Sequence, residues 1–271
     1  MTTAAPPAET AARLDVRQMA QFVMDGFIEF DDLVPEDLNA AVHEEQLRAP
    51  RDATWDPKIP DAFLDTSPAS QAVLELPRVK AILATLLGPS YIHDCSFLHI
   101  TPANQRSSQT WHVDHDRDGR RMTREDFYRF NILIAYFSHD VPREMGPTLI
   151  LPGSHLRQVG HDISRYRNIV GQQHLAGPGG RIAFLHDALW HCAQPNFTDQ
   201  PRFMLKVRYH SAEPQRGHFD ATGWDSLEMW RLFRDNVNRH AWQGSACDRV
   251  AALRDDWWRY LCGAELASVA A

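Results

Sequence analysis

The sequence predicts an α+β fold in which a mainly β core, an antiparallel barrel or jelly roll, lies between helices at both ends of the chain. Short strand patterns separated by turn residues fill the stretch from Tyr91 to His210, and helical patterns precede and follow it. With 271 residues, 44% of them hydrophobic and 23% charged, the chain is long enough to bury a sizeable core.

The N-terminal third is predicted to be largely helical. Residues 17–26 have the pattern of a short amphipathic helix that ends near Gly26 and leads into a strand, and a second helix is expected after Pro35. Residues 50–69 are rich in Pro, Asp and Ser, which predicts a loop. Residues 77–87 combine an N-terminal proline, apolar side chains at helical spacing and a following glycine, and they predict a third helix.

Strand patterns then replace the helical ones. Turn sequences such as Glu-Met-Gly-Pro and Gly-Pro-Gly-Gly separate them, and this succession predicts antiparallel strands. The expected strands are 92–100, 110–114, 130–137, 148–151, 181–185 and 203–209.

No repeat of fixed period and no obvious linker divides the chain, so we expect one domain over residues 15–271 after a disordered tail, residues 1–14. Its C-terminal part, residues 223–266, is expected to form a helical extension that is a candidate lid or homodimer contact.

Composition excludes several classes of partner. The net charge is −7 without a basic stripe, which argues against nucleic acid. The apolar runs are too short to span a membrane, and the first residues lack the pattern of a secretion signal. The four cysteines show no CxxC spacing and no dense framework, which favours a reducing, cytoplasmic environment.

The most informative motif is His112-Val-Asp114. On an extended strand its two polar side chains would lie on the same face, because strand side chains alternate with a period of two. His191 follows 79 residues later, and two imidazoles with one carboxylate can occupy one face of an octahedral iron ion. Taken alone, such a pair is more often structural or solvent-exposed than metal-binding.

Arg202 lies 11 residues beyond His191. Its planar guanidinium can bind a carboxylate through two parallel hydrogen bonds. A dicarboxylic co-substrate that binds iron through one end would need such a partner for the carboxylate at its other end. A surface salt bridge with Asp199 is the alternative interpretation.

From about Gln21 to His210 the chain resembles the phytanoyl-CoA dioxygenase family of non-haem iron, 2-oxoglutarate-dependent oxygenases. Five segments in the same order carry the resemblance: QFVMDGFIEFDDLVPEDL, LGPSYIHDCSFLHITP, QTWHVDHD, MGPTLILPGSH and GGRIAFLHDALWHCAQPNFTDQPRFMLKVRY. The resemblance implies a double-stranded β-helix, that is, a jelly roll, together with Fe(II), 2-oxoglutarate and O2 as cofactor and co-substrates.

Carried over residue by residue, the resemblance implies that His112, Asp114 and His191 hold Fe(II) and that Arg202 binds the distal carboxylate of 2-oxoglutarate. It also implies co-substrate contacts for Gln109 and Thr148, for which a strand-edge amide and a turn hydroxyl are the alternatives.

The chain departs from the family pattern at two positions. Thr101 stands where many members have lysine, and Ala193 where many have serine or glycine. Both differences are expected to remove polar contacts near the co-substrate, with His99 as a candidate replacement or as a structural residue.

The resemblance further implies hydroxylation of a small-molecule metabolite with release of succinate and CO2. Family members that halogenate lack the carboxylate ligand, so Asp114 argues against halogenation. Desaturation, epoxidation or cyclisation with the same cofactors is one alternative, a cupin-like metalloenzyme without 2-oxoglutarate is a second, and a catalytically silent binding protein is a third.

The substrate is not defined by the sequence. Four aromatic residues are candidates either for an apolar pocket or for the core, and a basic run after the metal motif either meets an acidic group or forms a solvated face. These residues are Trp55, Trp111, Phe137 and Trp190, and Arg117, Arg120, Arg121 and Arg124.

Overall fold

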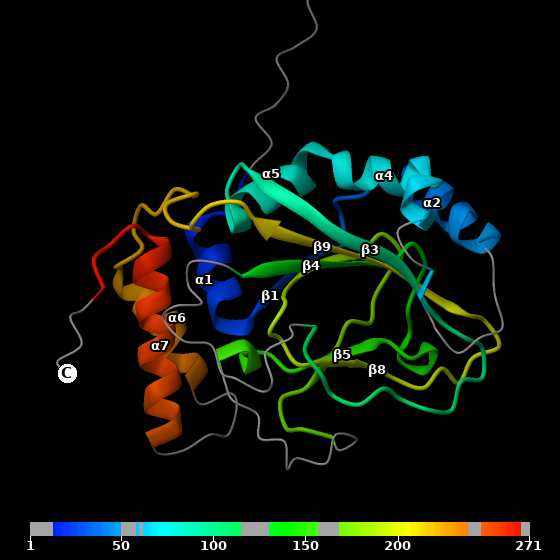
Figure 1. Ribbon diagram of the computed structural model, residues 1–271. Coiled ribbons are helices and arrows are strands. Elements are labelled where there is room, and N and C mark those ends of the chain that lie inside the picture. Colours follow the sequence, from blue (N-terminus) through cyan, green and yellow to red (C-terminus); the bar gives the residue numbers. More distant parts are fainter. Residues whose placement is uncertain are drawn as a thin grey trace, which may run out of the picture.

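Two antiparallel sheets lie face to face in the computed structural model, and helices cover the outer side of the larger sheet (Figure 1). The structure describes residues 13–49, 58–59, 62–114, 130–156, 168–237 and 245–266. The expected fold is confirmed: an α+β protein whose core is a double-stranded β-helix with flanking helices.

The larger sheet has the strand order β1-β7-β4-β9-β3-β2, and the smaller has the order β6-β5-β8. All pairings are antiparallel. The strands of the larger sheet are β1 (Phe27–Phe30), β7 (Ile182–His186), β4 (Asn131–Tyr136), β9 (Arg202–Ser211), β3 (Tyr91–Thr101) and β2 (Lys58–Ile59). Those of the smaller sheet are β6 (Gln173–His174), β5 (Thr148–Ile150) and β8 (His191–Ala193).

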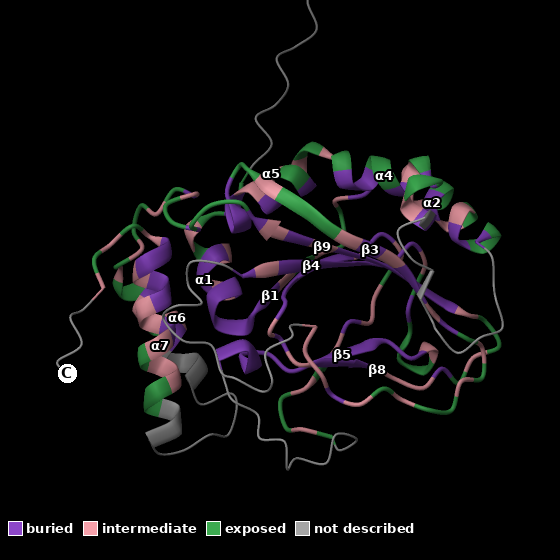
Figure 2. Cartoon of the chain, in the orientation of Figure 1, coloured by how far each residue is buried: buried purple, intermediate pink, exposed green. Residues whose placement is uncertain are grey.

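Helices flank the two sheets. Those before the first long strand are α1 (Val16–Asp25), α2 (Glu36–Arg48), α3 (Ala62–Asp65), α4 (Pro68–Glu75) and α5 (Pro77–Leu87). Those after the last strand are α6 (Leu227–Val237) and α7 (Ser245–Leu261), which pack against α1 beside the sheets (Figure 1). Figure 2 shows β4 and β9 buried along most of their length, whereas α4 buries one side and exposes the other. No helix in the described ranges is long and apolar enough to cross a membrane.

Side-chain alternation divides the core in two. Along β9, Phe203, Leu205 and Val207 pack with the helices in one apolar cluster. Met204 points the other way and packs with Leu133, Ala183 and the small-sheet residue Ile150. Because neighbouring residues of a strand face opposite sides, one face of β9 builds the helical core and the other faces the smaller sheet.

Most sequence-based elements agree with the structure, but some differ. The helix over residues 77–87 has the expected bounds, whereas the expected loop over residues 50–69 contains β2, α3 and the start of α4. The expected strand over residues 110–114 is reduced to a single bridge at His112, and β6 and β8 were not expected. The tail, Trp55 and the four arginines that follow the metal motif lie outside the described residues, apart from the last two positions of the tail.

Gly26 connects the end of α1 to the jelly roll through backbone hydrogen bonds. Gly26 has φ 78°, its N–H donates to Phe22 O over 2.8 Å, and its carbonyl accepts from His186 N over 2.8 Å. A Cβ at this position would lie 2.4 Å from His155 Nδ1. His155 is 1% exposed and packs against Trp257, so its ring cannot easily move aside.

We expect Gly26→Ala to destabilise the protein more than Gly223→Ala. Both glycines have positive φ, 78° and 80°, but a Cβ at Gly223 meets nothing within 4 Å. The control should lose about 1 kcal/mol from left-handed strain alone, and Gly26→Ala a further 1–3 kcal/mol or so from overpacking. Urea denaturation measures both free energies of unfolding, and equal losses would contradict the steric argument.

Candidate metal centre

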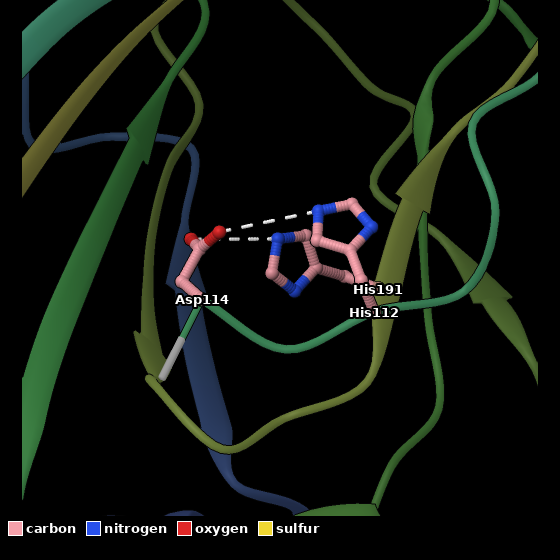
Figure 3. Close-up of side chains that lie close together, drawn as sticks. All are labelled: His112, Asp114 and His191. Carbon is pink, nitrogen blue, oxygen red and sulfur yellow. Dashed lines mark ion pairs between the residues drawn. The ribbon is translucent and has the colours of Figure 1, made fainter. Parts of the chain in front are cut away.

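Three potential ligands converge where the smaller sheet meets an irregular segment. His112 and His191 form an antiparallel bridge, each donating its backbone N–H to the other's carbonyl over 3.0 and 2.9 Å. Asp114 follows on a bend, and its carboxylate points toward both imidazoles (Figure 3). One ligand atom from each residue lies within 4.8 Å of the others.

Asp114 reaches this position in a way that differs from the expectation. The sequence predicted a continuous strand that would place residues 112 and 114 on one face. Instead, the strand-like pairing ends at His112, and the bend at Asp114 directs its side chain back toward the imidazoles.

Backbone carbonyls orient the two imidazoles. His112 Nδ1 lies 2.8 Å from Thr110 O, and His191 Nδ1 lies 2.9 Å from Leu189 O. A carbonyl oxygen only accepts hydrogen bonds, so these contacts assign the ring proton to Nδ1 and leave the Nε2 lone pair for another partner. Each Nε2 faces Asp114, at 3.9 Å from Oδ1 for His112 and 3.5 Å from Oδ2 for His191. This is the arrangement that metal-binding histidines use.

The local environment keeps these groups in the protonation states that a metal requires. Burial, helped by the neighbouring His191, lowers the pKa of His112 to about 4, so its imidazole is neutral at pH 7. Burial alone would raise the pKa of Asp114, but the adjacent His191 and Lys206 together lower it well below its usual range. A neutral imidazole and an ionised carboxylate are the ligand forms of these side chains.

Arg202 begins β9 on the face that points toward the smaller sheet, and it is completely buried. Its guanidinium donates to two threonine hydroxyls, Thr101 Oγ1 at 2.6 Å and Thr148 Oγ1 at 3.4 Å, and lies over the Phe137 ring. Burial lowers the pKa of Arg202 to about 10, so the group remains charged at pH 7. Within the described ranges no carboxylate lies within 4.0 Å of it, and the expected alternative of an Asp199 salt bridge is absent.

The departure from the family pattern at Thr101 does not remove a polar contact from this region. Thr101 pairs with Arg202 across β3 and β9, and its Oγ1 accepts from both Nε and Nη2 of the guanidinium. His99, two residues earlier on the same face, has Nδ1 at 3.0 Å from Arg202 Nη2 and accepts from it. The two side chains orient the arginine, a role that the sequence had left open for His99.

The remaining candidate residues lie in different settings. Thr148 is buried beside Arg202, as its expected role requires. Gln109 lies in an exposed position, and its Oε1 accepts from Ala193 N over 3.1 Å. Trp111 and Trp190 pack with the apolar side chains of β5 and β8. The co-substrate roles of Gln109 and Thr148 stay predictions.

Two cations of the site were not predicted from the sequence motifs. Lys206 Nζ lies 2.6 Å from Asp114 Oδ2, and Arg208 Nη1 donates to the Asp114 carbonyl over 3.4 Å. Both follow Arg202 on β9 at even spacing, four and six residues later. The period-two rule applied to the arginine would have placed all three on one face.

A jelly roll in which two imidazoles and a carboxylate converge beside a buried arginine has the features of a non-haem iron oxygenase. The phytanoyl-CoA dioxygenase (PhyH) family model matches residues 24–204. The chain therefore belongs to the phytanoyl-CoA dioxygenase family, whose enzymes are non-haem iron, 2-oxoglutarate-dependent oxygenases.

Solved structures share the fold at low sequence identity. EctD from S. alaskensis, solved with 2-oxoglutarate and 5-hydroxyectoine, is 22% identical over 75% of this chain and 78% of its own, with a TM-score of 0.59. The α-ketoglutarate-dependent epimerase SnoN from nogalamycin biosynthesis is 20% identical over 72% and 82%, with a TM-score of 0.57. The non-haem monooxygenase ThoJ, as a nickel complex, is 22% identical over 73% and 79%, with a TM-score of 0.53. The comparison with curated proteins found no match.

We expect Thr101→Val to lower the free energy of unfolding by about 1–3 kcal/mol, because it keeps the side-chain shape but leaves buried guanidinium N–H groups without an acceptor. The matched control is Thr222→Val at an exposed threonine whose hydroxyl donates to the surface residue Asp220. That change should cost about 0.5 kcal/mol or less. Denaturant titration compares the two, and an unchanged stability for Thr101→Val would contradict the contact's importance.

Proposed function

We propose that this chain hydroxylates an unactivated C–H bond of a small-molecule metabolite, with release of succinate and CO2. In this proposal His112, Asp114 and His191 hold Fe(II), and Arg202 binds the distal carboxylate of 2-oxoglutarate. The observation that supports it most directly is the convergence of the three donor atoms within 4.8 Å.

The donor set fits the metal. Two imidazoles whose Nδ1 atoms lie against backbone carbonyls, together with one ionised carboxylate, would leave three positions of an octahedral ion open. Bound Fe(II) and 2-oxoglutarate together supply the oxidising power of the reaction by activating O2. The chain's own residues fix the ligand geometry and hold the co-substrate.

Arg202 favours 2-oxoglutarate over a cupin-like reaction that does not use it. A buried guanidinium held by neutral threonine and histidine side chains, without a carboxylate within ion-pair distance in the described residues, can pair with an incoming carboxylate in a bidentate geometry. A metalloenzyme that used only the three ligands would gain nothing from this buried charge, which burial makes costly.

Asp114 favours hydroxylation over halogenation, because a halide would need the position that its carboxylate can take. Desaturation, epoxidation or cyclisation with the same cofactors is distinguished by the product. One added oxygen indicates hydroxylation or epoxidation, and a loss of two hydrogens indicates desaturation or ring closure. Cytoplasmic location, a single domain and a homodimer stay predictions from the sequence.

We expect Asp114→Ala to lower iron-dependent succinate formation more than about 100-fold, since loss of a ligand should exceed the effect of losing one of its hydrogen-bond partners. The assay follows succinate formation in the presence of Fe(II), 2-oxoglutarate and O2, with no added substrate, as uncoupled turnover. Asp220→Ala, at an exposed aspartate whose side chain accepts hydrogen bonds from Thr222, is the control and should keep full activity. Retained turnover in Asp114→Ala would contradict its assignment as a ligand.

We expect Arg202→Met to raise the dissociation constant of 2-oxoglutarate about 10–100-fold, as the loss of a charge-assisted pair implies. An anaerobic titration of the Fe(II) protein, followed by the visible metal-to-ligand charge-transfer band, gives this constant. Arg106→Met, at a surface arginine that lies over the Phe197 ring, provides a control of equal charge. Equal affinities in the wild type and Arg202→Met would favour the cupin-like alternative.

A further inference from the structure

Strand β9 places a row of cations along its inner face. Arg202, Lys206 and Arg208 are separated by even numbers of residues, so their side chains leave the strand on the same side. Lys206 pairs across the sheet with Phe97 of β3 and Ala135 of β4. At the rise of an extended strand, its Cα lies about 13 Å from that of Arg202.

The ammonium group of Lys206 lies beside the candidate metal ligands. Its Nζ lies 2.6 Å from Asp114 Oδ2, 3.5 Å from His191 Nε2 and 5.3 Å from the centre of the Phe97 ring. Its side chain is 9% exposed. Among the residues that the structure describes, Asp114 provides the only carboxylate within 4.0 Å of this ammonium.

A divalent ion and the ammonium compete for the same carboxylate. An ion bonded at about 2 Å to both Asp114 Oδ2 and His191 Nε2 would lie less than about 4 Å from the present position of Nζ, where two positive charges repel strongly in a buried site. Asp114 would then offer its charge to the ion, and the buried ammonium of Lys206 would need a second anionic partner.

The direction of β9 indicates where that partner comes from. In the proposed function, 2-oxoglutarate spans from the metal toward Arg202, so Lys206 and Arg208 lie at and beyond the metal, on the side away from the co-substrate. Arg208 is already paired with Asp94. The charges of the ion and Arg202 would balance Asp114 and the two carboxylates of 2-oxoglutarate, so that among the described residues of the site Lys206 would carry the unbalanced charge.

We propose that Lys206 binds an anionic group, a carboxylate or a phosphate, on the substrate, and that Asp114 exchanges this ammonium for the metal ion. This inference rests on the proposed function and specifies its substrate class: a metabolite with a negative charge near the C–H bond that reacts. Lys206 is thus a specificity-determining residue that contacts substrate, and it also weakens metal binding.

The first test measures Co(II) affinity by calorimetry in protein freed of metal with a chelator. Lys206→Met should bind Co(II) more tightly than the wild type, by about tenfold, because no ammonium has to be displaced. Lys80→Met, at an exposed lysine paired with Glu75, is the control and should bind Co(II) as the wild type does. Unchanged or weaker binding by Lys206→Met would overturn the exchange.

The second test uses the Co(II) and 2-oxoglutarate complex without O2, titrated separately with acetate, inorganic phosphate and neutral acetamide while the visible Co(II) bands are followed. One of the two anions should bind the wild type and the Lys80→Met control about 10–100-fold more tightly than Lys206→Met, and the tighter anion distinguishes carboxylate from phosphate. Acetamide should not discriminate among the three proteins. Equal anion affinities in wild type and Lys206→Met, or no response of the wild type to either anion, would overturn the proposal.

Two further measurements keep the outcome interpretable. Thermal unfolding of every variant shows whether it is folded. If Lys206→Met does not fold, Lys206→Gln replaces it in both tests. A wild-type protein that binds neither Co(II) nor 2-oxoglutarate would refute the proposed function itself, whereas binding of both with no dependence on Lys206 would refute only this inference.

Discussion

The reciprocal backbone hydrogen bonds between His112 and His191 are the constraint on which the candidate centre depends. They join positions 79 residues apart in the sequence and bring the two imidazole rings to 4.5 Å between centroids. Strand β8 is itself held by β5, since Ile150 pairs with His191 and Thr148 with Ala193. The smaller sheet therefore fixes the second imidazole, and the bridge transmits that position to the first and to Asp114, two residues later.

A second set of contacts, between β3 and β9, positions the charged groups relative to this centre. Thr101 lies opposite Arg202, and Phe97 lies opposite Lys206. The register of this one strand pair therefore sets the positions of both cations relative to the metal ligands. The same alternation sends Phe203, Leu205 and Val207 into the helical core. A shift of one residue would turn the cations toward the apolar helices and the three apolar side chains toward the smaller sheet, which makes this register strongly determined.

Sequence patterns predicted the elements whose pattern is local. Residues 77–87 combine helical periodicity with an N-terminal proline and a following glycine, and the strands β3, β4 and β9 are short strand patterns bounded by turn residues, so both kinds of element were predicted closely. Strand β8 has three residues and depends on β5, and Asp114 reaches its place through a bend. Strand β8 and the position of Asp114 depend on contacts between distant segments, which a local sequence pattern does not predict. The alternation of strand side chains could have placed Lys206 on the same face as Arg202. Its contact with Asp114 could not be predicted, because it depends on the three-dimensional fold.

The two buried cations, Lys206 and Arg202, differ in whether a negatively charged partner neutralises them, and this difference bears on function. Lys206 has a carboxylate partner in Asp114, whereas in the described part of the chain Arg202 meets neutral acceptors, chiefly Thr101, His99 and Thr148. Neutral acceptors satisfy the N–H groups but do not neutralise the charge, and burial alone lowers the pKa of Arg202 to about 10. The folded chain therefore carries an electrostatic cost at Arg202 that an arriving carboxylate relieves. Because hydrogen bonds from the strand pair already orient the guanidinium, little further ordering opposes that binding.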